Sequence, residues 1–474
     1  MNSLMRVNSK KILLQLVSLV WLLAAAFVHA EKSRPNIIIY LSDDHSRDDS
    51  GAYGNNVVRT PNLDALAKES LLFTRAFAAS PTCSPSRSAL MTGLFPMRNG
   101  AHPNHGQIKD GIKTWPKYFQ EIGYRVVIAG KTDIRPRAAF PFEYVVAKVD
   151  PKAPSLHEVL DAKAVDQFLA DHARTNTKPL CLLVDDWNPH VVWAENDGYD
   201  PAKIKLPPYL ADTLETRKAM TRYYTDVALM DKTLGACLAS MKKYGFENSL
   251  FIYTSDQGAQ VPHAKWNVYD AGLNVPFLVR WPRKVKSGKT DAMISLIDVL
   301  PTCLEAGGGK APGEIDGESF LPVVFGKTSK HRDFIFGAHT SDIFFKPNGN
   351  ELWEFPMRCV RTETHKYILN FNPERTFHTH ISDAEGRDGK IYWDTWVEQA
   401  KTNPATAELV QNYRHRPAEE LYDLRNDPYE LHNVAADAKN HKLLLSLRKR
   451  TLDWMKQQEE SEPEIVKSLS SSAP

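Results

Sequence analysis

Residues 82–93 read TCSPSRSALMTG and place a cysteine, a proline and an arginine at the spacing C-x-P-x-R, before a helical pattern. The chain has five cysteines, and their spacing is not typical of a zinc site or a disulfide framework. Cys181 and Cys237 lie in apolar segments, where a buried thiol is the expected state. Cys83 has polar neighbours, which indicates that this residue takes part in chemistry.

Four segments begin with apolar or β-branched runs, as strands do, and end in polar residues: 35–45, 124–133, 180–190 and 248–258. Their polar ends are Asp43 with Asp44, Lys131, Asn188 with His190, and Asp256 with Gln257. In α/β sheets, ligands bind beyond the carboxyl ends of the strands. We therefore expect one pocket at one edge of the sheet to gather these side chains.

These residue types suit a divalent cation and an anion together. Asp43, Asp44, Asp256 and an amide offer hard oxygen ligands, which favour Ca²⁺ or Mg²⁺ over zinc. Three neighbouring acids would repel one another without a cation. Three fixed cations also lie near these segments in the sequence: Arg87, Lys131 and Lys265. A helix start at Cys83 would favour an anion as well, so the pattern predicts a site for a tetrahedral oxyanion.

The elements that must position this site alternate along the chain. Helical patterns at 60–77 and 216–245 lie between the strands, which predicts an α/β fold with a large, mostly parallel mixed sheet flanked by helices. From about residue 335, short strands predict a small antiparallel sheet, followed by a closing helix at 441–460 and a frayed tail. We expect a catalytic domain over 31–334 and a C-terminal subdomain over 335–474.

Composition and the N-terminus limit the partners and the compartment. Lys and Arg number 59 against 57 Asp and Glu, which gives no electrostatic case for nucleic acid. Basic residues precede an apolar run over 12–28, and small residues follow at 28–30. This pattern predicts a signal peptide over 1–30 and a secreted or periplasmic protein. A retained anchor is the alternative, because the run is nearly long enough to span a bilayer.

CSPSR followed by SALMTG resembles the signature of the type I sulfatases, in which the first residue of C-x-P-x-R is oxidised to formylglycine (3-oxoalanine). Segments 35–45, 60–80, 295–308 and 420–435 resemble other parts of that family in the same order. The resemblance implies an alkaline phosphatase/sulfatase-like fold. It also implies that Cys83 acts as an aldehyde hydrate and that a formylglycine-generating or sulfatase-maturating enzyme is a partner.

Within the family, the chain is similar to heparan N-sulfatases (sulfamidases), notably at 49–73, at NPH in 188–190 and at 355–372. This similarity implies that Asp43, Asp44 and Asp256 are calcium ligands and that Gln257 completes the set. It implies that Arg87 and Lys131 hold the hydrate at position 83. His190 would be a catalytic histidine, and Lys265 a base that binds sulfate.

Two positions depart from the family pattern. Gln257 stands where Asn or His is usual, and it is one methylene longer than Asn. The family reads G-K-x-H, whereas GKTD puts Asp133 in place of the histidine, and an ionised carboxylate cannot donate a hydrogen bond. His102, His105 or His263 could supply the missing donor. The residues expected to bind substrate are His105, Asp133, His263, His339 and Arg358.

The resemblance implies a sulfatase that acts on a sulfated oligosaccharide bearing a terminal O-sulfo or N-sulfo group. A hydroxyl of the hydrate would attack sulfur, and His190 or Lys265 would protonate the leaving group. Two alternatives remain open. One is a phosphodiester or phosphonate hydrolase of the same superfamily. The other is a non-catalytic glycan-binding protein on the sulfatase scaffold.

Overall fold

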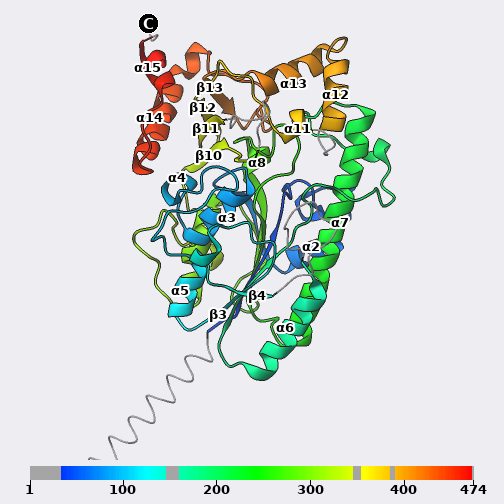
Figure 1. The fold of residues 1–474 in the computed structure, drawn as a ribbon, viewed down its shortest axis with the longest axis vertical. Coiled ribbons are helices and arrows are strands. Elements are labelled where there is room, and N and C mark those ends of the chain that lie inside the picture. Colours follow the sequence, from blue (N-terminus) through cyan, green and yellow to red (C-terminus); the bar gives the residue numbers. More distant parts are fainter. Residues whose placement is uncertain (1–33, 146–159, 345–353, 385–389, 472–474) are drawn as a thin grey trace, which may run out of the picture.

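The computed structural model describes residues 34–145, 160–344, 354–384 and 390–471, so the predicted signal peptide over 1–30 lies outside the described residues. A nine-stranded mixed sheet occupies the N-terminal part, and a four-stranded antiparallel sheet follows in the C-terminal part (Figure 1). Both sheets agree with the predicted fold class. None of the helices in the described ranges is long and apolar enough to cross a membrane.

The four predicted strands are neighbours in one parallel block. β1 (Ile37–Ser42) lies between β5 (Leu180–Asp185) and β6 (Leu250–Ser255), and all six of its residues are buried. β3 (Arg125–Gly130) pairs with β5, and the edge strand β4 (Glu143–Val145) pairs with β3. Because these strands are parallel, their carboxyl ends meet at the same edge of the sheet.

The other half of the sheet changes direction. β7 (Asn274–Arg280) runs antiparallel to β6 and to β2 (Leu71–Phe77), and the short strands β8 (Gly288–Thr290) and β9 (Ile294–Ser295) pair with β2. The predicted single helix over 60–77 was wrong, because α2 (Pro61–Lys68) ends before β2 begins. The run LLFTRAF is rich in apolar and aromatic residues that suit a strand, and β7 supplies the pairing partner.

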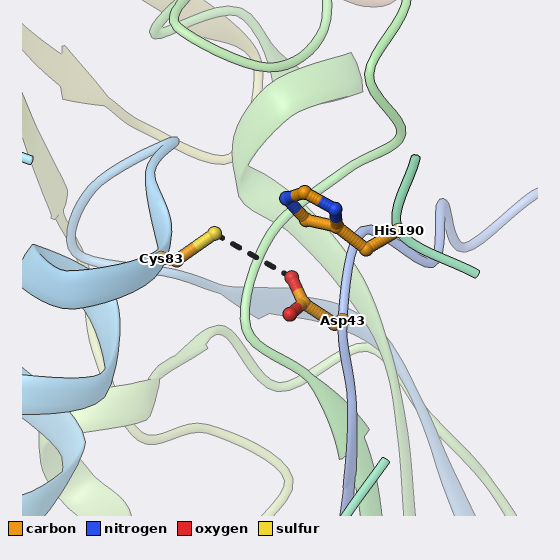
Figure 2. Close-up of side chains that lie close together, drawn as sticks. All are labelled: Asp43, Cys83 and His190. Carbon is orange, nitrogen blue, oxygen red and sulfur yellow. Dashed lines mark hydrogen bonds between the residues drawn. The ribbon is translucent and has the colours of Figure 1, made fainter. Parts of the chain in front are cut away.

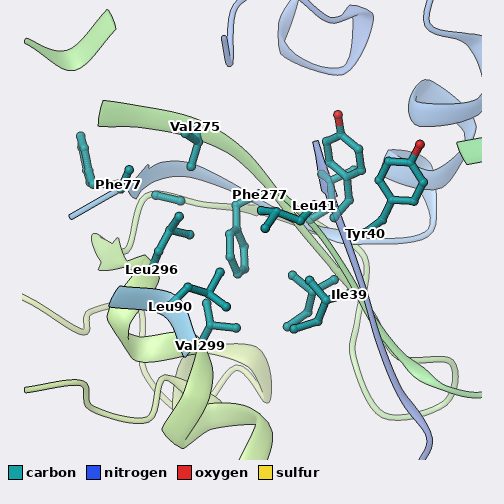
Figure 3. Packing of buried hydrophobic residues seen from close by; sticks show 14 of the residues in the cluster. Ile39, Tyr40, Leu41, Phe77, Leu90, Val275, Phe277, Leu296 and Val299 are labelled. Atoms are coloured by element: carbon teal, nitrogen blue, oxygen red, sulfur yellow. The ribbon is translucent and has the colours of Figure 1, made fainter. Parts of the chain in front are cut away.

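Helices cover both faces of the large sheet (Figure 1). α2, α6 (Ala162–Thr175) and the predicted long helix α7 (Leu214–Lys243) lie on one side. α3 (Cys83–Thr92) and α5 (Trp115–Glu121) lie on the other side, where α9 (Val299–Ala306) packs against both. Leu90 of α3 and Val299 of α9 pack with Phe277 of β7, so the buried core holds α3 firmly (Figure 3).

The C-terminal sheet has the order β10 (Ile335–Ser341), β11 (Glu354–Arg361), β12 (His365–Asn370) and β13 (Glu419–Asp423). The predicted closing helix is α14 (His441–Gln457), which packs on β11 and β12. The tail, expected to be frayed, forms α15 (Glu464–Ser471), because Val466 is buried against the subdomain. The other helices are α4 (Pro96–Asn99), α8 (Asp270–Leu273), α10 (Leu321–Val324), α11 (His380–Asp383), α12 (Lys390–Gln399) and α13 (Pro404–Arg414). Short 3₁₀ turns occur at Gly51–Tyr53, Arg137–Ala139, Pro201–Lys203, Leu296–Asp298 and Ala438–Asn440.

Candidate active site

The chain turn after β1 brings two consecutive carboxylates to one place. In an extended strand, successive side chains point to opposite faces. Asp44 has a φ of +63°, in the left-handed region, which interrupts this alternation after Asp43. The backbone nitrogen of Asp44 donates to Oδ1 of Asp256 at 3.1 Å, so the ends of β1 and β6 are held together.

Three carboxylates form a buried cluster suited to a divalent cation. One oxygen from each of Asp43, Asp44 and Asp256 lies within 4.8 Å of the others, and all three side chains are inaccessible to solvent. Gln257 Nε2 donates to Asp44 Oδ1 at 2.6 Å and to Cys83 Sγ at 3.1 Å. Its Oε1 is buried and has no hydrogen-bond partner among the described residues. Three carboxylates and an unsatisfied amide oxygen fit a hard cation such as Ca²⁺.

Three buried cations surround the carboxylates. Lys131 Nζ donates to Asp43, and Lys265 Nζ donates to Asp44 Oδ2 at 2.7 Å. Arg87 Nε donates to Asp256 Oδ2 at 2.8 Å. Burial, followed by the neighbouring Asp43, raises the pKa of Asp256, and burial also raises the pKa of Asp44. The carboxylate charges are thus only partly compensated by the protein's own cations.

The predicted residue Cys83 opens α3 and lies against this cluster. Its Sγ is 3.5 Å from Asp43 Oδ1, and the residue is 2% exposed (Figure 2). Burial and the Asp43 charge raise the pKa of the Cys83 thiol well above its usual range. A thiol held neutral is a poor nucleophile. The five cysteines, all within the described ranges, are free and buried, so none pairs with Cys83.

The predicted histidine at position 190 faces the same cluster (Figure 2). His190 Nε2 lies 3.7 Å from Asp44 Oδ2, and Nδ1 lies 2.5 Å from the carbonyl oxygen of Val191. An imidazole nitrogen this close to a carbonyl oxygen must donate, which leaves Nε2 as the acceptor when the ring is neutral. Burial and the charge of Lys265 lower the pKa of His190 well below its usual range.

The structure shows which histidine accompanies Asp133. His105 Nδ1 lies 3.4 Å from Asp133 Oδ1, and Lys131 Nζ lies 3.9 Å from Asp133 Oδ2. Of the other two candidates, His263 is stacked on Tyr269, and its Nε2 contacts the Tyr429 carbonyl at 2.9 Å. His102 lies near Arg358 and Glu460 instead, and both charges act on its pKa. His105 is therefore the imidazole that the fold brings to Asp133.

Two further predicted residues lie in the C-terminal subdomain. The Arg358 guanidinium is bound by the Glu460 carboxylate and donates to the His339 carbonyl at 2.7 Å. His339 is 5% exposed, and its Nδ1 has no hydrogen-bond partner within the described ranges. Within the described ranges, neither side chain makes a hydrogen bond or an ion pair with the Cys83 cluster.

Several residues at the site were not identified from the sequence. Asp185 ends β5 and forms a buried ion pair with Arg87, and burial raises its pKa to about 7. The rule that ligands gather beyond strand ends could have found it, because Asp185 is the last residue of β5, in the same segment 180–190 that carries His190. Asp342 and His380 come from the C-terminal part and lie near His105. No sequence signal marked them.

Comparisons with known proteins place the chain in a family. The family model described as "Sulfatase" matches residues 35–309, and the model "N-sulphoglucosamine sulphohydrolase, C-terminal" matches residues 262–383. An ulvan-active sulfatase from Formosa agariphila is 34% identical over 90% of this chain and 81% of its own length. The chain belongs to the sulfatase family. This sulfatase is therefore a hydrolase of sulfate esters or sulfamates, and the non-catalytic alternative is not retained.

Other relatives of this sulfatase share less sequence identity with it. Human N-sulphoglucosamine sulphohydrolase is 27% identical over 89% of this chain and 90% of its own length. The solved structure of a phosphonate monoester hydrolase from Agrobacterium radiobacter has a TM-score of 0.67 and 20% identity, over 90% of this chain and 96% of that one. At this identity the likeness shows the fold alone, so the fold by itself does not separate sulfate from phosphonate chemistry.

Proposed function

We propose that this sulfatase removes a terminal O-sulfo or N-sulfo group from a sulfated oligosaccharide, with a nucleophile formed from Cys83 and with Ca²⁺ as the metal. The family model and the 34% identical ulvan-active sulfatase support sulfate as the group removed. The human relative, N-sulphoglucosamine sulphohydrolase, supports a sulfated amino sugar as one substrate type. The phosphonate hydrolase alternative is weaker, because fold likeness alone supports it.

The observation that carries this proposal is the state of Cys83. Its thiol is buried beside Asp43, and its pKa is raised, so the residue is unsuited to act as a thiolate. Yet the same residue opens α3, a helix whose ten residues are all buried, next to three cations. The positive end of a helix and buried cations favour a tetrahedral oxyanion bound at this position.

Formylglycine at position 83, as its hydrate, would supply two geminal hydroxyls, one to attack sulfur and one whose deprotonation releases the sulfate. Side chains of this protein can move the protons that the attack on sulfur and the departure of the leaving group require. His190 Nε2, the acceptor nitrogen, faces Asp44 and Cys83 and can take a proton from a hydroxyl at position 83. Lys265 Nζ contacts the same Asp44 oxygen as His190, and it can donate a proton to the leaving oxygen or nitrogen.

Asp43, Asp44, Asp256 and the Gln257 amide oxygen would hold the metal, which would supply positive charge against the sulfuryl oxygens. Arg87 Nη2 is buried and makes no hydrogen bond within the described part of the chain. It lies 3.6 Å from Asp43 Oδ2, so it is available to an oxyanion beside Cys83. Lys131, which donates to Asp43, adds a second fixed charge at this position.

Released sulfate and phosphate, measured on matched sulfated and phosphorylated sugars, test the function. We expect sulfate release by wild-type protein from a host with a maturation system, and an aldehyde at position 83 by peptide mass spectrometry. Cys83→Ala should abolish turnover, and Cys83→Ser should not sustain it, because serine offers a single hydroxyl. Full activity with an unmodified thiol, or a preference for phosphate, would refute the proposal.

We also propose that segment 1–30 is a cleaved signal peptide and that the mature protein is secreted or periplasmic. The support is the order of basic, apolar and small residues in that segment. Intact mass of the protein recovered from its native compartment tests this. A mature chain that retains residues 1–30 would support the anchor alternative instead.

A further inference from the structure

A run of charged and imidazole side chains leads away from Lys131 of the catalytic cluster. Lys131 Nζ lies 3.9 Å from Asp133 Oδ2, and Asp133 Oδ1 lies 3.4 Å from His105 Nδ1. His105 Nε2 in turn lies 3.7 Å from Asp342 Oδ2. This run of contacts joins Lys131 of the catalytic cluster to Asp342, which directly follows β10 in the C-terminal part.

The same run continues back to the catalytic cluster. Asp342 Oδ2 lies 3.7 Å from His380 Nε2, and the His380 ring stacks on Trp266 with centroids 5.3 Å apart. Lys265 Nζ lies 5.3 Å from the centroid of the Trp266 ring. Because Lys265 binds Asp44, the contacts begin and end at cations of the Cys83 site.

A shorter run of contacts links Lys131 to Asp44. Lys131 Nζ lies 4.7 Å from the centroid of Trp187, and the Trp187 and His190 rings are 4.3 Å apart. His190 returns to Asp44 at 3.7 Å. The two runs therefore form a closed circuit, which we call the rim, made of Lys131, Asp133, His105, Asp342, His380, Trp266, Lys265, Asp44, His190 and Trp187.

The rim is graded in depth. The His105 and His380 side chains are 21% and 30% exposed, whereas those of Asp133 and Asp342 are 7% and 5% exposed. Asp133 Oδ2 is a buried atom without a hydrogen-bond partner among the described residues, whereas Asp133 Oδ1 faces His105 Nδ1. Buried polar atoms are normally satisfied, so the Asp133 Oδ2 oxygen indicates a ligand that brings its own donor.

The neighbours of Asp133 and Asp342 favour the ionised form of both carboxylates. Burial opposes ionisation of Asp133 and Asp342, but His105 and His380 lower their pKa values, that of Asp342 to about 2. The rim cations Lys131 and Lys265 already bind Asp43 and Asp44.

A further cation, Arg135, lies near Phe344. Its guanidinium is 5.7 Å from the centroid of Phe344, which is 61% exposed and whose ring centroid lies 4.7 Å from that of His105.

We propose that Asp133, Asp342, His105 and His380 form a sugar subsite that accepts hydroxyl or ammonium groups beside the scissile sulfate and excludes a second sulfate or a carboxylate there. The inference rests on the proposed function and names its substrate class. Carboxylates accept hydrogen bonds from hydroxyl and ammonium groups, whereas like charges brought together repel one another. The enzyme thus takes sugars that other enzymes have already stripped of neighbouring anions.

Binding to the calcium-loaded Cys83→Ser protein tests the subsite without turnover. The probes are glucosamine N-sulfate against the same sugar with an added O-sulfate on the neighbouring carbon, and a hexose O-sulfate against the matching uronic acid O-sulfate. By calorimetry, we expect each doubly anionic probe to bind at least about tenfold more weakly, because it meets like charge. Equal or tighter binding of the doubly anionic probes, or no binding of either singly anionic probe, would overturn the inference.

Isosteric variants separate recognition from folding. In the Cys83→Ser background, Asp342→Asn and Asp133→Asn should each bring the ratio of the two dissociation constants to within about threefold, since the repelling charge is gone. Asp453→Asn, an exposed carboxylate on α14 that pairs with Lys449, is the matched control and should leave the ratio unchanged. A purely structural role would weaken both probes by the same factor, so an unchanged ratio in the rim variants contradicts the proposal.

Turnover by the wild-type enzyme distinguishes failure of the proposed subsite from failure of the proposed function. Sulfate release from singly anionic sugars, with no discrimination against the doubly anionic ones, would leave the proposed function standing and remove the subsite. Discrimination in binding with no sulfate release from any probe would support the subsite and refute the proposed function.

Discussion

Replacing Asp256 with asparagine should change the stability of this sulfatase in opposite directions with and without calcium. Asp256 lies among the proposed metal ligands, and burial followed by the Asp43 charge raises its pKa. An acid whose folded pKa is raised is destabilising when ionised, so the metal-free protein carries that cost at neutral pH. A neutral amide of the same shape removes it.

The magnitude follows from the distances. Oxygens of Asp43 and Asp44 lie within 4.8 Å of Asp256, and each unit charge at that distance repels by about 3 kcal/mol at an effective dielectric constant of about 20. Arg87 Nε, 2.8 Å from Asp256 Oδ2, attracts the Asp256 carboxylate by about 6 kcal/mol at the same dielectric constant. These terms nearly cancel, and burial adds a further cost to the ionised form. We therefore expect Asp256→Asn to stabilise the metal-free protein by about 1–2 kcal/mol.

With calcium the sign reverses. A cation present at about a hundredfold its dissociation constant stabilises the folded state by about 2.7 kcal/mol, and losing a carboxylate ligand forfeits much of this. Urea unfolding in chelator and in saturating calcium measures both values. Asp231→Asn is the matched control, since Asp231 is buried and accepts hydrogen bonds from Asn62 and Leu63 away from the cluster. Equal destabilisation by Asp256→Asn in both conditions, or a wild type indifferent to chelator, would refute the reasoning.

Three more predictions concern other residues of the site and the subdomain. Gln257→Asn shortens the arm that holds the unsatisfied Oε1 and should lower the chelator sensitivity of activity; identical chelator titrations for the two proteins would show that position 257 does not limit metal affinity. Burial lowers the pKa of His339 to about 3, so the protein is fully stable with respect to this group above the unfolded pKa of about 6.5 and loses stability as the pH falls toward 3. Between pH 7.5 and pH 5, the free energy of unfolding measured in urea should fall by about 2 kcal/mol less for His339→Gln than for wild type. Equal falls in the two proteins would contradict this. Glu460→Gln leaves the buried Arg358 guanidinium without its carboxylate and should cost about 3 kcal/mol of unfolding free energy with KM unchanged; a raised KM at unchanged stability would instead place Arg358 at the substrate.

The parallel strands and the cluster at their ends could be predicted from the sequence. Apolar β-branched runs that end in acids, a lysine and a histidine are local patterns, and parallel strands necessarily bring their carboxyl ends to one edge. The spacing C-x-P-x-R is equally local, because it places Cys83 and Arg87 one turn apart on the same helix. The segment 60–77 shows the limit of such reasoning. Its second half forms β2 because it pairs with β7, which lies far along the chain. The local helical pattern contains no information about that pairing.

Only the tertiary structure decided the surroundings of Asp133. Three histidines were equally eligible by sequence, and the packing of the chain placed His105 beside Asp133 while His263 stacked on Tyr269. Asp342 and His380 come from the C-terminal part of the chain, where Asp342 contacts both His105 and His380. No sequence motif predicted these contacts. The physical reason is that a residue's neighbours across two packed sheets depend on the sum of many weak contacts along both interfaces, whereas periodicity and motif spacing record only what adjoins a residue along its own strand or helix.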